Sequence, residues 1–268
     1  MTALLTVRDL TVRFGGVTAL DGVSFAVPAG QVCGLIGPNG AGKTTLFDCV
    51  SRLTRPQAGR IELGAAPHGH DLLVLHPHQV AALGIARTFQ HLGLVASLSV
   101  RDNVMLGAAA GAGGSGGPYR SRAGFAASAL RLPLVRAEER DLRRRADQVL
   151  DRLGLAGIAA HPAAGLPYGT LKRVELARAL AAEPALLMLD EPASGLAHGE
   201  VDELAELIED VCRDGELTVL LVEHHMGMVM RLSDTVVVLD FGRVIAAGTP
   251  AEVREDPVVL EAYLGAAT

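Results

Sequence analysis

Nine residues rich in glycine, 37–45, limit more than any other segment what this chain can fold into. They read Gly-Pro-Asn-Gly-Ala-Gly-Lys-Thr-Thr and match the phosphate-loop pattern G-x-x-x-x-G-K-[ST]. Glycines allow the tight turn that points backbone N–H groups at phosphate oxygens, and the lysine adds a positive charge. The residues that we expect to contact the nucleotide phosphates are Gly37, Asn39, Gly40, Gly42, Lys43, Thr44 and Thr45.

The neighbours of this loop agree with that interpretation. Residues 31–36 read as a buried strand and residues 43–53 as a helix. A phosphate would then lie at a helix N-terminus, where the helix dipole and free N–H groups favour it. The alternative, a glycine-rich turn with a chance lysine, does not explain strand, loop and helix in this order. We therefore predict that the chain binds ATP or a similar triphosphate, with the Thr44 hydroxyl as a ligand of Mg²⁺.

The composition favours a globular protein with reduced cysteines. Hydrophobic residues make up 49% of the 268, and no apolar run reaches the ~18 residues that a membrane span needs. The first residues do not form a signal-peptide pattern. Cysteines 33, 49 and 212 have neither disulfide nor metal spacing, which predicts a cytosolic protein. The net charge of −6 argues against a broad nucleic-acid surface.

Two runs near the N-terminus, 5–14 and 19–27, alternate apolar and polar residues. This alternation predicts two antiparallel strands, joined by a turn at the glycine pair 15–16. Phe14 stands just before that turn. It could belong to the core, but we expect it to stack on the purine ring of the nucleotide, because an aromatic ring stacks on any base.

Residues 64–78 read as an irregular loop that carries four histidines. His68, His70, His76 and His78 form two His-x-His pairs, which raises the possibility of a metal site. Neither cysteines nor a carboxylate cluster accompany them. A solvated loop is therefore the preferred interpretation.

The middle of the chain, 97–164, differs in character from the rest and predicts an inserted helical subdomain. A helix begins at residues 99–106, a connection of glycine, alanine and serine follows at 107–117, and an amphipathic helix covers 137–153. The arginine run 143–145 could bind nucleic acid, but a solvated helix face is the preferred interpretation.

The remaining residues predict an α/β core that alternates strands and helices. The expected strands are 60–63, 85–89, 185–190, 217–223, 235–239 and 243–247, and the expected helices are 78–83, 170–182, 200–212 and 258–264. The fold class is thus α/β, a phosphate-loop core with a mainly parallel sheet and helices, an N-terminal antiparallel β subdomain and the helical insertion. We expect the core to comprise 1–96 and 165–268.

Three polar side chains follow two buried strands of this core. Asp190 and Glu191 end one apolar run, and His224 follows the next. Because ligands of open α/β sheets bind at the carboxyl ends of strands, these side chains should face the phosphate loop. We expect Asp190 to hold Mg²⁺, Glu191 to activate the attacking water and His224 to contact the γ-phosphate.

With these residues in view, the chain resembles the ATP-binding subunits of ABC transporters along nearly its whole length. GPNGAGKTT at 37–45 and LLMLDEP at 186–192 correspond to the Walker A and Walker B motifs, and SGLA at 194–197 to the D-loop. LPYGT at 166–170 stands where the family has its LSGGQ signature. The resemblance implies the ABC ATPase architecture.

The same resemblance assigns further residues to the site. It implies that Gln90 is the Q-loop glutamine, which serves catalysis and the metal ion, and that His224 is the switch histidine. It also implies that Leu166, Tyr168 and Gly169, in the signature, contact the nucleotide of a second ATPase subunit.

Four longer stretches are similar to the ATPases of branched-chain amino acid importers. They are RFGGVTALDGVSF, RTFQHLGLVASLSVRDNV, EHHMGMVMRLSD and GTPAEVREDPVVLEAYLG. This implies an ATPase at the cytoplasmic face of the inner membrane that drives permease subunits, served by a periplasmic or extracellular solute-binding protein, without a nucleic-acid partner. Lipopolysaccharide export, amide or urea uptake, a soluble ABC ATPase acting on nucleic acid and a regulatory subunit with little hydrolysis are the alternatives.

Three residues depart from the family pattern. Pro167 lacks the hydroxyl and the N–H of the usual serine, Thr170 is shorter than the usual glutamine, and Ala197 lacks the polar group common at the end of the D-loop. All three belong to surfaces expected to serve the nucleotide of the opposite subunit. We therefore expect a heterodimer with two unequal sites.

Overall fold

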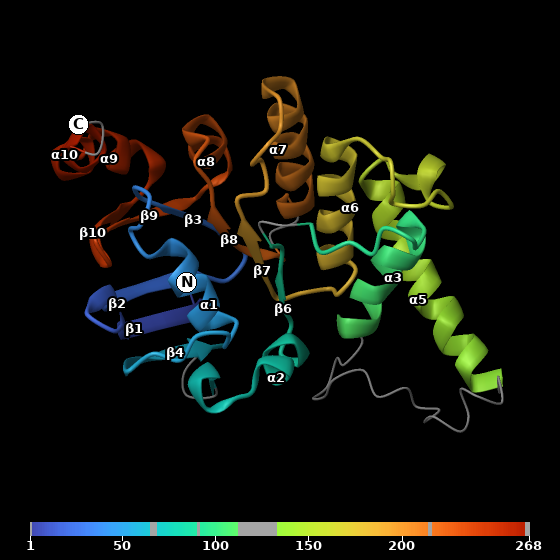
Figure 1. Ribbon diagram of the computed structural model, residues 1–268, viewed down its shortest axis with the longest axis horizontal. Helices are drawn as coiled ribbons and strands as arrows, with labels where there is room; N and C mark the ends of the chain where they lie inside the picture. The colour runs from blue at the N-terminus through green and yellow to red at the C-terminus, as the bar shows by residue number, and fades with distance from the viewer. Residues whose placement is uncertain (1, 65–68, 90–91, 112–132, 214–215, 266–268) are drawn as a thin grey trace. The chain divides into compact units, whose positions relative to one another are not determined.

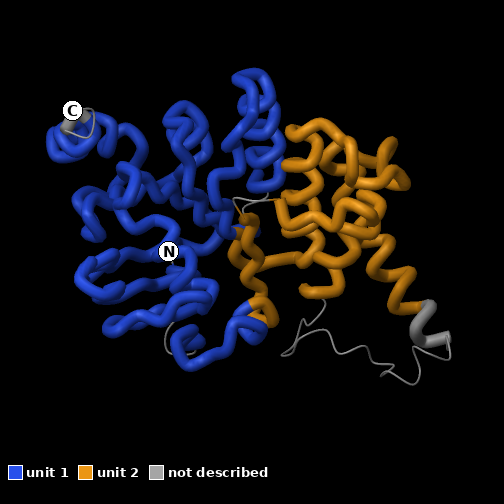
Figure 2. Tube along the Cα trace, in the orientation of Figure 1, with its two compact units in different colours: residues 1–80, 188–268 blue, residues 81–187 orange. Residues whose placement is uncertain are grey.

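The computed structural model describes residues 2–64, 69–89, 92–111, 133–213 and 216–265. Two compact units make up the chain, and Figure 2 colours them separately. Unit 1 comprises residues 1–80 and 188–268, and unit 2 comprises residues 81–187. The predicted helical segment 97–164 lies within unit 2.

An antiparallel sheet opens unit 1, with strand order β2-β1-β4-β5. Its strands are β1 (Ala3–Phe14), β2 (Val17–Pro28), β4 (Ala58–Leu63) and β5 (His70–Asp71). Alternate residues near the start of β1 are buried, as at Leu5 and Val7. One face of the sheet therefore packs inward, which agrees with the alternation in the sequence.

The second sheet of unit 1 positions the polar residues of interest. Its strand order runs β10-β9-β3-β8-β7, and β3 is parallel to both of its neighbours. The strands are β3 (Val32–Ile36), β7 (Leu186–Asp190), β8 (Thr218–Val222), β9 (Thr235–Asp240) and β10 (Arg243–Gly248). All residues of β3, β7 and β8 are buried, which explains why these strands read as continuous apolar runs.

Helices of unit 1 accompany its two sheets, and Figure 1 labels most of them. They are α1 (Lys43–Val50), η1 (Leu72–Val74), α2 (Pro77–Ala82), α7 (His198–Cys212), α8 (Met226–Leu232), α9 (Pro250–Glu255) and α10 (Pro257–Gly265). Val229 of α8, Val253 of α9 and Val259 of α10 pack with β9 in one apolar cluster. The short helices α8 and α9 were not predicted, whereas the equally short α2 was predicted at 78–83. A helix of six or seven residues gives only a weak helical period.

Unit 2 contains β6 (Ile85–Arg87), α3 (Val100–Gly111), α5 (Pro133–Arg152), η2 (Ala156–Ile158) and α6 (Tyr168–Leu180). The helix α6 starts two residues earlier than predicted, so Tyr168 and Gly169 lie in its first turn. Within the described residues, no helix has both the length and the apolar character that crossing a membrane would require.

The prediction of a flexible connection at 107–117 was wrong for its first part, because α3 extends to Gly111. A Cβ atom at Gly107 would stand 1.9 Å from the Arg178 carbonyl oxygen, and one at Gly111 1.9 Å from that of Ala182. The glycines thus let α3 approach the end of α6 closely. Residues 112–117 lie outside the described residues. The irregular loop predicted at 64–78 is also partly wrong, since it contains β5 and η1.

Candidate active site

The phosphate loop connects β3 to α1 and fits its surroundings only with glycine at two positions. Gly37 and Gly42 have φ angles of 150° and 104°, which side chains disfavour. A Cβ at Gly37 would stand 2.0 Å from the Leu239 carbonyl oxygen, and one at Gly42 2.5 Å from that of Ala19. Backbone contacts with the neighbouring strands thus hold the loop in shape.

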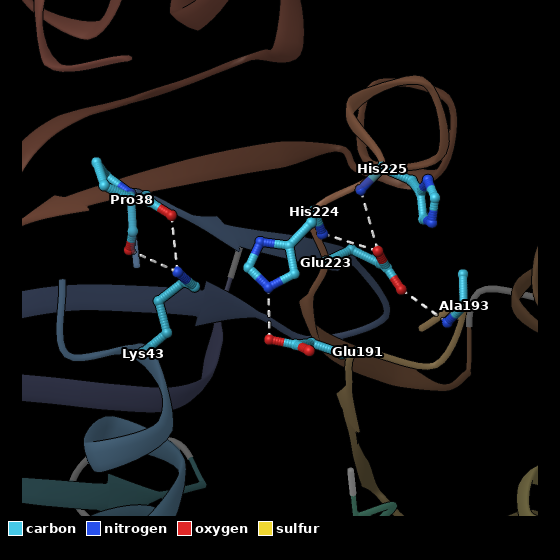
Figure 3. A network of polar contacts seen from close by, with 8 residues as sticks. Pro38, Lys43, Glu191, Ala193, Glu223, His224 and His225 are labelled. Carbon is cyan, nitrogen blue, oxygen red and sulfur yellow. Dashed lines mark hydrogen bonds and ion pairs between the residues drawn. The ribbon is translucent and has the colours of Figure 1, made fainter. Parts of the chain in front are cut away.

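Lys43 directs its ammonium group into this loop (Figure 3). Its side chain is buried, and Nζ donates hydrogen bonds to the carbonyl oxygens of Gly37 at 2.7 Å and Pro38 at 2.9 Å. Burial lowers the pKa of Lys43, and the negative charges of Glu191 and Asp190 oppose that effect. A cation therefore stands inside a cradle of backbone groups, next to two carboxylates.

The carboxyl end of β7 carries these two acidic residues. Asp190 is buried, whereas the Glu191 side chain keeps 18% of its surface exposed. Glu191 has a φ of 49°, a strained angle for a residue with a side chain. Its backbone N–H donates to the Val222 carbonyl oxygen of β8 at 2.8 Å. The two strand ends are thus tied together where the acidic side chains emerge.

His224 meets Glu191 across this junction. Its Nε2 lies 2.6 Å from Glu191 Oε1, and the histidine side chain is 46% exposed. Figure 3 shows the imidazole above the carboxylate, with Lys43 nearby. One site in unit 1 therefore brings together the side chains of residues 43, 191 and 224, which lie far apart in the sequence.

Glu223 belongs to the same network, although sequence reasoning gave it no function. Its buried carboxylate accepts backbone N–H bonds from Ala193, His224 and His225 (Figure 3). The sequence offered one signal, a carboxylate that ends a continuous apolar strand. An acidic group in such a position needs nearby donors, because burying it unpaired is costly.

The other predicted binding residues of unit 1 lie on or beside the loop and at the end of β1. Asn39, Gly40 and Thr44 are exposed, and Thr45 is half-buried in the first turn of α1. Phe14 ends β1 with 54% of its surface exposed. These side chains are accessible to a ligand. The catalytic prediction for Gln90 lies outside the described residues.

The predicted signature residues belong to unit 2. Leu166 precedes α6, Pro167 is its N-cap residue, and Tyr168 and Gly169 begin it. Tyr168 is 43% exposed, and the Lys172 ammonium lies 5.7 Å from the centre of its ring. The tyrosine thus offers an exposed aromatic surface at the start of a helix, supported from within its own unit.

Two alternative sites raised by the sequence gain no support among the described residues. His76 and His78 stack their rings 5.7 Å apart, and no group of three metal-ligating side chains gathers in the described part of the chain. His68 lies outside the described residues. Carboxylates of unit 2 balance the arginine run, since Arg143 pairs with Asp147 and Arg144 with Asp141.

Two family models match this chain. A model described as ABC transporter matches residues 20–194, and one described as Branched-chain amino acid ATP-binding cassette transporter matches residues 243–268. The first match contains the phosphate loop and the acidic end of β7. The second begins at β10 and covers the C-terminal helices.

Curated relatives are similar over nearly the full length. The high-affinity branched-chain amino acid transport ATP-binding protein BraF of Pseudomonas aeruginosa is 38% identical over 265 residues, 98% of either protein. LivG of Escherichia coli K12, with the same description, is 38% identical over 264 residues, again 98% of either protein. The methionine import ATP-binding protein MetN of Thermobifida fusca is 35% identical over 90% of this chain and 67% of its own length.

Solved structures share the fold. A nucleotide-free ATP-binding cassette from an ABC transporter superposes with a TM-score of 0.79 at 28% identity, covering 98% of this chain and 99% of its own. The ADP conformation of another such cassette gives a TM-score of 0.80 at 29% identity, covering 99% and 100%. The α/β fold predicted from the sequence is thereby confirmed.

Proposed function

The chain belongs to the ABC transporter family, and from that membership we propose that it is the ATP-hydrolysing subunit of an importer for branched-chain or related amino acids. One observation carries the choice of substrate. The similarity to branched-chain amino acid transport proteins extends over 98% of the chain, and the model that matches its C-terminal residues carries the same description. The predicted family resemblance is confirmed.

The phosphate loop is proposed to hold the triphosphate. The loop leads into the N-terminus of α1, where the helix dipole and the free N–H groups of the first turn favour negative charge. Lys43 would exchange its two carbonyl contacts for phosphate oxygens. The exposed ring of Phe14 is proposed to stack on the adenine base.

Glu191 is proposed to orient the attacking water and accept its proton. Its contact with His224 leaves the second carboxylate oxygen available for water and fixes the orientation of the side chain. His224, from the end of β8, would hold Glu191 and contact the γ-phosphate. Lys43 would stabilise the negative charge that develops on the phosphate oxygens.

The residues of this site also suit a magnesium ion. Thr44 offers a hydroxyl at the start of α1 and Asp190 a carboxylate at the end of β7, the oxygen ligands that Mg²⁺ prefers. When bound, the ion would neutralise charge on the phosphates. Gln90 is proposed as a further ligand on the family resemblance alone.

An importer ATPase works with permease subunits and with a second ATPase subunit. We place this chain at the cytoplasmic face of the inner membrane on its permease, with a solute-binding protein acting from outside. The signature LPYGT supports pairing with a different ATPase, because Pro167 and Thr170 offer fewer hydrogen bonds to the opposite nucleotide than serine and glutamine would. An importer for another amino acid is the second candidate, since a methionine import protein is 35% identical.

A test combines transport and hydrolysis in the assembled transporter. Proteoliposomes that contain the permease and partner ATPase, supplied with the solute-binding protein, should accumulate leucine only with ATP. Glu191→Gln should lower hydrolysis by about 100-fold or more, because a general base contributes at least that much, and should trap ATP in a closed dimer. Glu209→Gln, which removes from α7 a carboxylate paired with Arg231 of α8, is the matched control and should hydrolyse ATP normally.

Two results would contradict the proposal. Rapid hydrolysis by the Glu191→Gln variant would remove Glu191 from the role of base. Failure to transport leucine, isoleucine and valine, with transport of methionine or another solute instead, would replace the substrate and leave the ATPase assignment standing.

A further inference from the structure

Glu223 is a buried acidic residue to which the mechanism above gives no part. It directly follows β8, and only 2% of its surface is exposed. It stands between the two segments that carry the catalytic side chains, the turn after β7 and the residues that precede α8 (Figure 3). An ionised carboxylate accepts hydrogen bonds only, so its surroundings must supply donors.

The two oxygens of Glu223 serve different segments. Oε1 accepts the N–H of Ala193 at 2.7 Å. Oε2 accepts the N–H groups of His224 at 2.7 Å and His225 at 3.1 Å. One side chain thus joins the turn that carries Glu191 to the backbone that carries His224, and hydrogen bonds to a charged acceptor are among the stronger ones in proteins.

This bridge acts on a strained turn. Glu191 has its φ of 49°, and the Ser194 N–H donates to its carbonyl oxygen at 3.1 Å, which closes the turn. On one side the Glu191 N–H is bound to Val222 of β8, and on the other the Ala193 N–H is bound to Glu223. Both ties lead to the end of β8. Strained backbone persists only where its surroundings hold it in this way.

We propose that Glu223 is a positioning residue for ATP hydrolysis, whose carboxylate locks the turn of Glu191 against the segment of His224. The inference rests on the roles proposed above for Glu191 and His224. The function of the Glu223 carboxylate is to maintain the 2.6 Å contact between Glu191 and His224, so that the base faces the attacking water. It neither binds ATP nor takes a proton.

Two substitutions distinguish two possible roles of Glu223, as a link between the two segments and as a buried negative charge alone. In Glu223→Gln, the amide retains one acceptor oxygen, so either the Ala193 side or the histidine side loses its acceptor. In Glu223→Asp, the charge remains near His224 and His225, but the side chain is one methylene too short to reach Ala193 as well. If Glu223 links the two segments, both variants should lose ATP hydrolysis in the same way.

The expected result is a division between kcat and nucleotide binding. In the assembled transporter, both variants should lower kcat about 10- to 100-fold, since small displacements of catalytic groups have effects of this size. The Kd for a fluorescent ATP analogue, measured on the full-length chain, should stay within about twofold, because the phosphate loop is untouched. The backbone amides of Glu191, Ala193, Ser194 and residues 223–226 should exchange hydrogen faster than in the parent protein.

Glu252→Gln is the matched control. Glu252 also accepts a backbone N–H, that of Thr249 at 2.7 Å, but it caps α9 instead of joining catalytic segments. This variant should keep the parent kcat and the parent exchange rates at Glu191, Ala193 and Ser194. An equal loss of kcat in the control would assign the effect of Glu223 to general destabilisation and overturn the proposal.

The outcomes also separate this inference from the proposed function. If Glu191→Gln hydrolyses ATP normally, the proposed catalytic roles are wrong, whatever Glu223 does. If Glu191→Gln is inactive while Glu223→Gln and Glu223→Asp keep the parent kcat, only the positioning role is overturned. If neither Glu223 variant folds, the carboxylate is needed for folding and the positioning role is again rejected.

Discussion

The chain contains only two lysines, one in each unit, and both are buried. Lys43 of unit 1 is held by two backbone carbonyl groups. Lys172 of unit 2 instead lies over the Tyr168 ring, and its charge acts on the buried carboxylate of Glu175. Lys43 also lies near the carboxylates of Glu191 and Asp190, but its hydrogen bonds go to neutral carbonyl oxygens, which phosphate oxygens can replace. Lys172 instead acts on a buried carboxylate of its own helix.

The residues near the two lysines also differ between the units. In unit 1, hydrogen bonds between distant segments lock Glu191, Glu223 and His224 together. In unit 2, the signature begins a helix at Pro167, whose side chain makes no capping hydrogen bond. On the proposed function, unit 1 holds one half of a hydrolytic site, and unit 2 would serve the nucleotide of a partner subunit.

The largest expected effect compares the two lysines directly. Lys43→Ala should weaken ATP binding about 100-fold, because it removes charge-assisted hydrogen bonds to the phosphates. Lys172→Ala should leave ATP affinity within about twofold but lower the Tm, because the buried Glu175 carboxylate loses its counter-charge. Isothermal titration calorimetry and thermal unfolding measure the two quantities. Equal losses of affinity would remove the distinction drawn between these lysines.

A smaller effect is expected at the signature. Thr170→Gln should raise the turnover of the assembled transporter roughly threefold, since it restores about one hydrogen bond toward the opposite nucleotide. In Thr170→Leu, the leucine side chain is similar in size to glutamine but lacks the amide, so this variant should not raise the turnover. An unchanged rate in the glutamine variant would count against unequal sites.

The smallest effect concerns stability in unit 2. Burial raises the pKa of Glu175, although Lys172, Arg178 and the backbone of Phe89 oppose that shift. The folded state therefore favours the protonated carboxyl group of Glu175. Glu175 contributes stability at pH values below its unfolded pKa and loses this contribution as the pH rises through its folded pKa.

Glu175→Gln carries no charge at any pH, and its amide oxygen can still accept the Phe89 N–H bond. Its Tm relative to the parent should rise by about 2 °C between pH 4 and pH 7, measured by calorimetry. A difference that stays flat, or falls, over this range would show that Lys172 and Arg178 outweigh burial at Glu175.

Much of the fold was predictable because the spacing of apolar residues along a segment reflects which of its faces are buried. The buried strands β3, β7 and β8 read as apolar runs, and β1 as an alternation, since burial on two faces or one leaves these signatures. Gly107 and Gly111 misled the prediction, because glycine in a sequence indicates flexibility just as readily as close helix packing.

The parts of the candidate site that lie within one short segment were also predictable. The sequence by itself determined the phosphate loop and the acidic pair at 190 and 191, because each depends on neighbouring residues in a short segment. Only the tertiary structure decided that Glu223 bridges to Ala193, thirty residues away. That contact exists because β7 and β8 are adjacent in the sheet, and strand order is a property of the folded chain that no local pattern encodes.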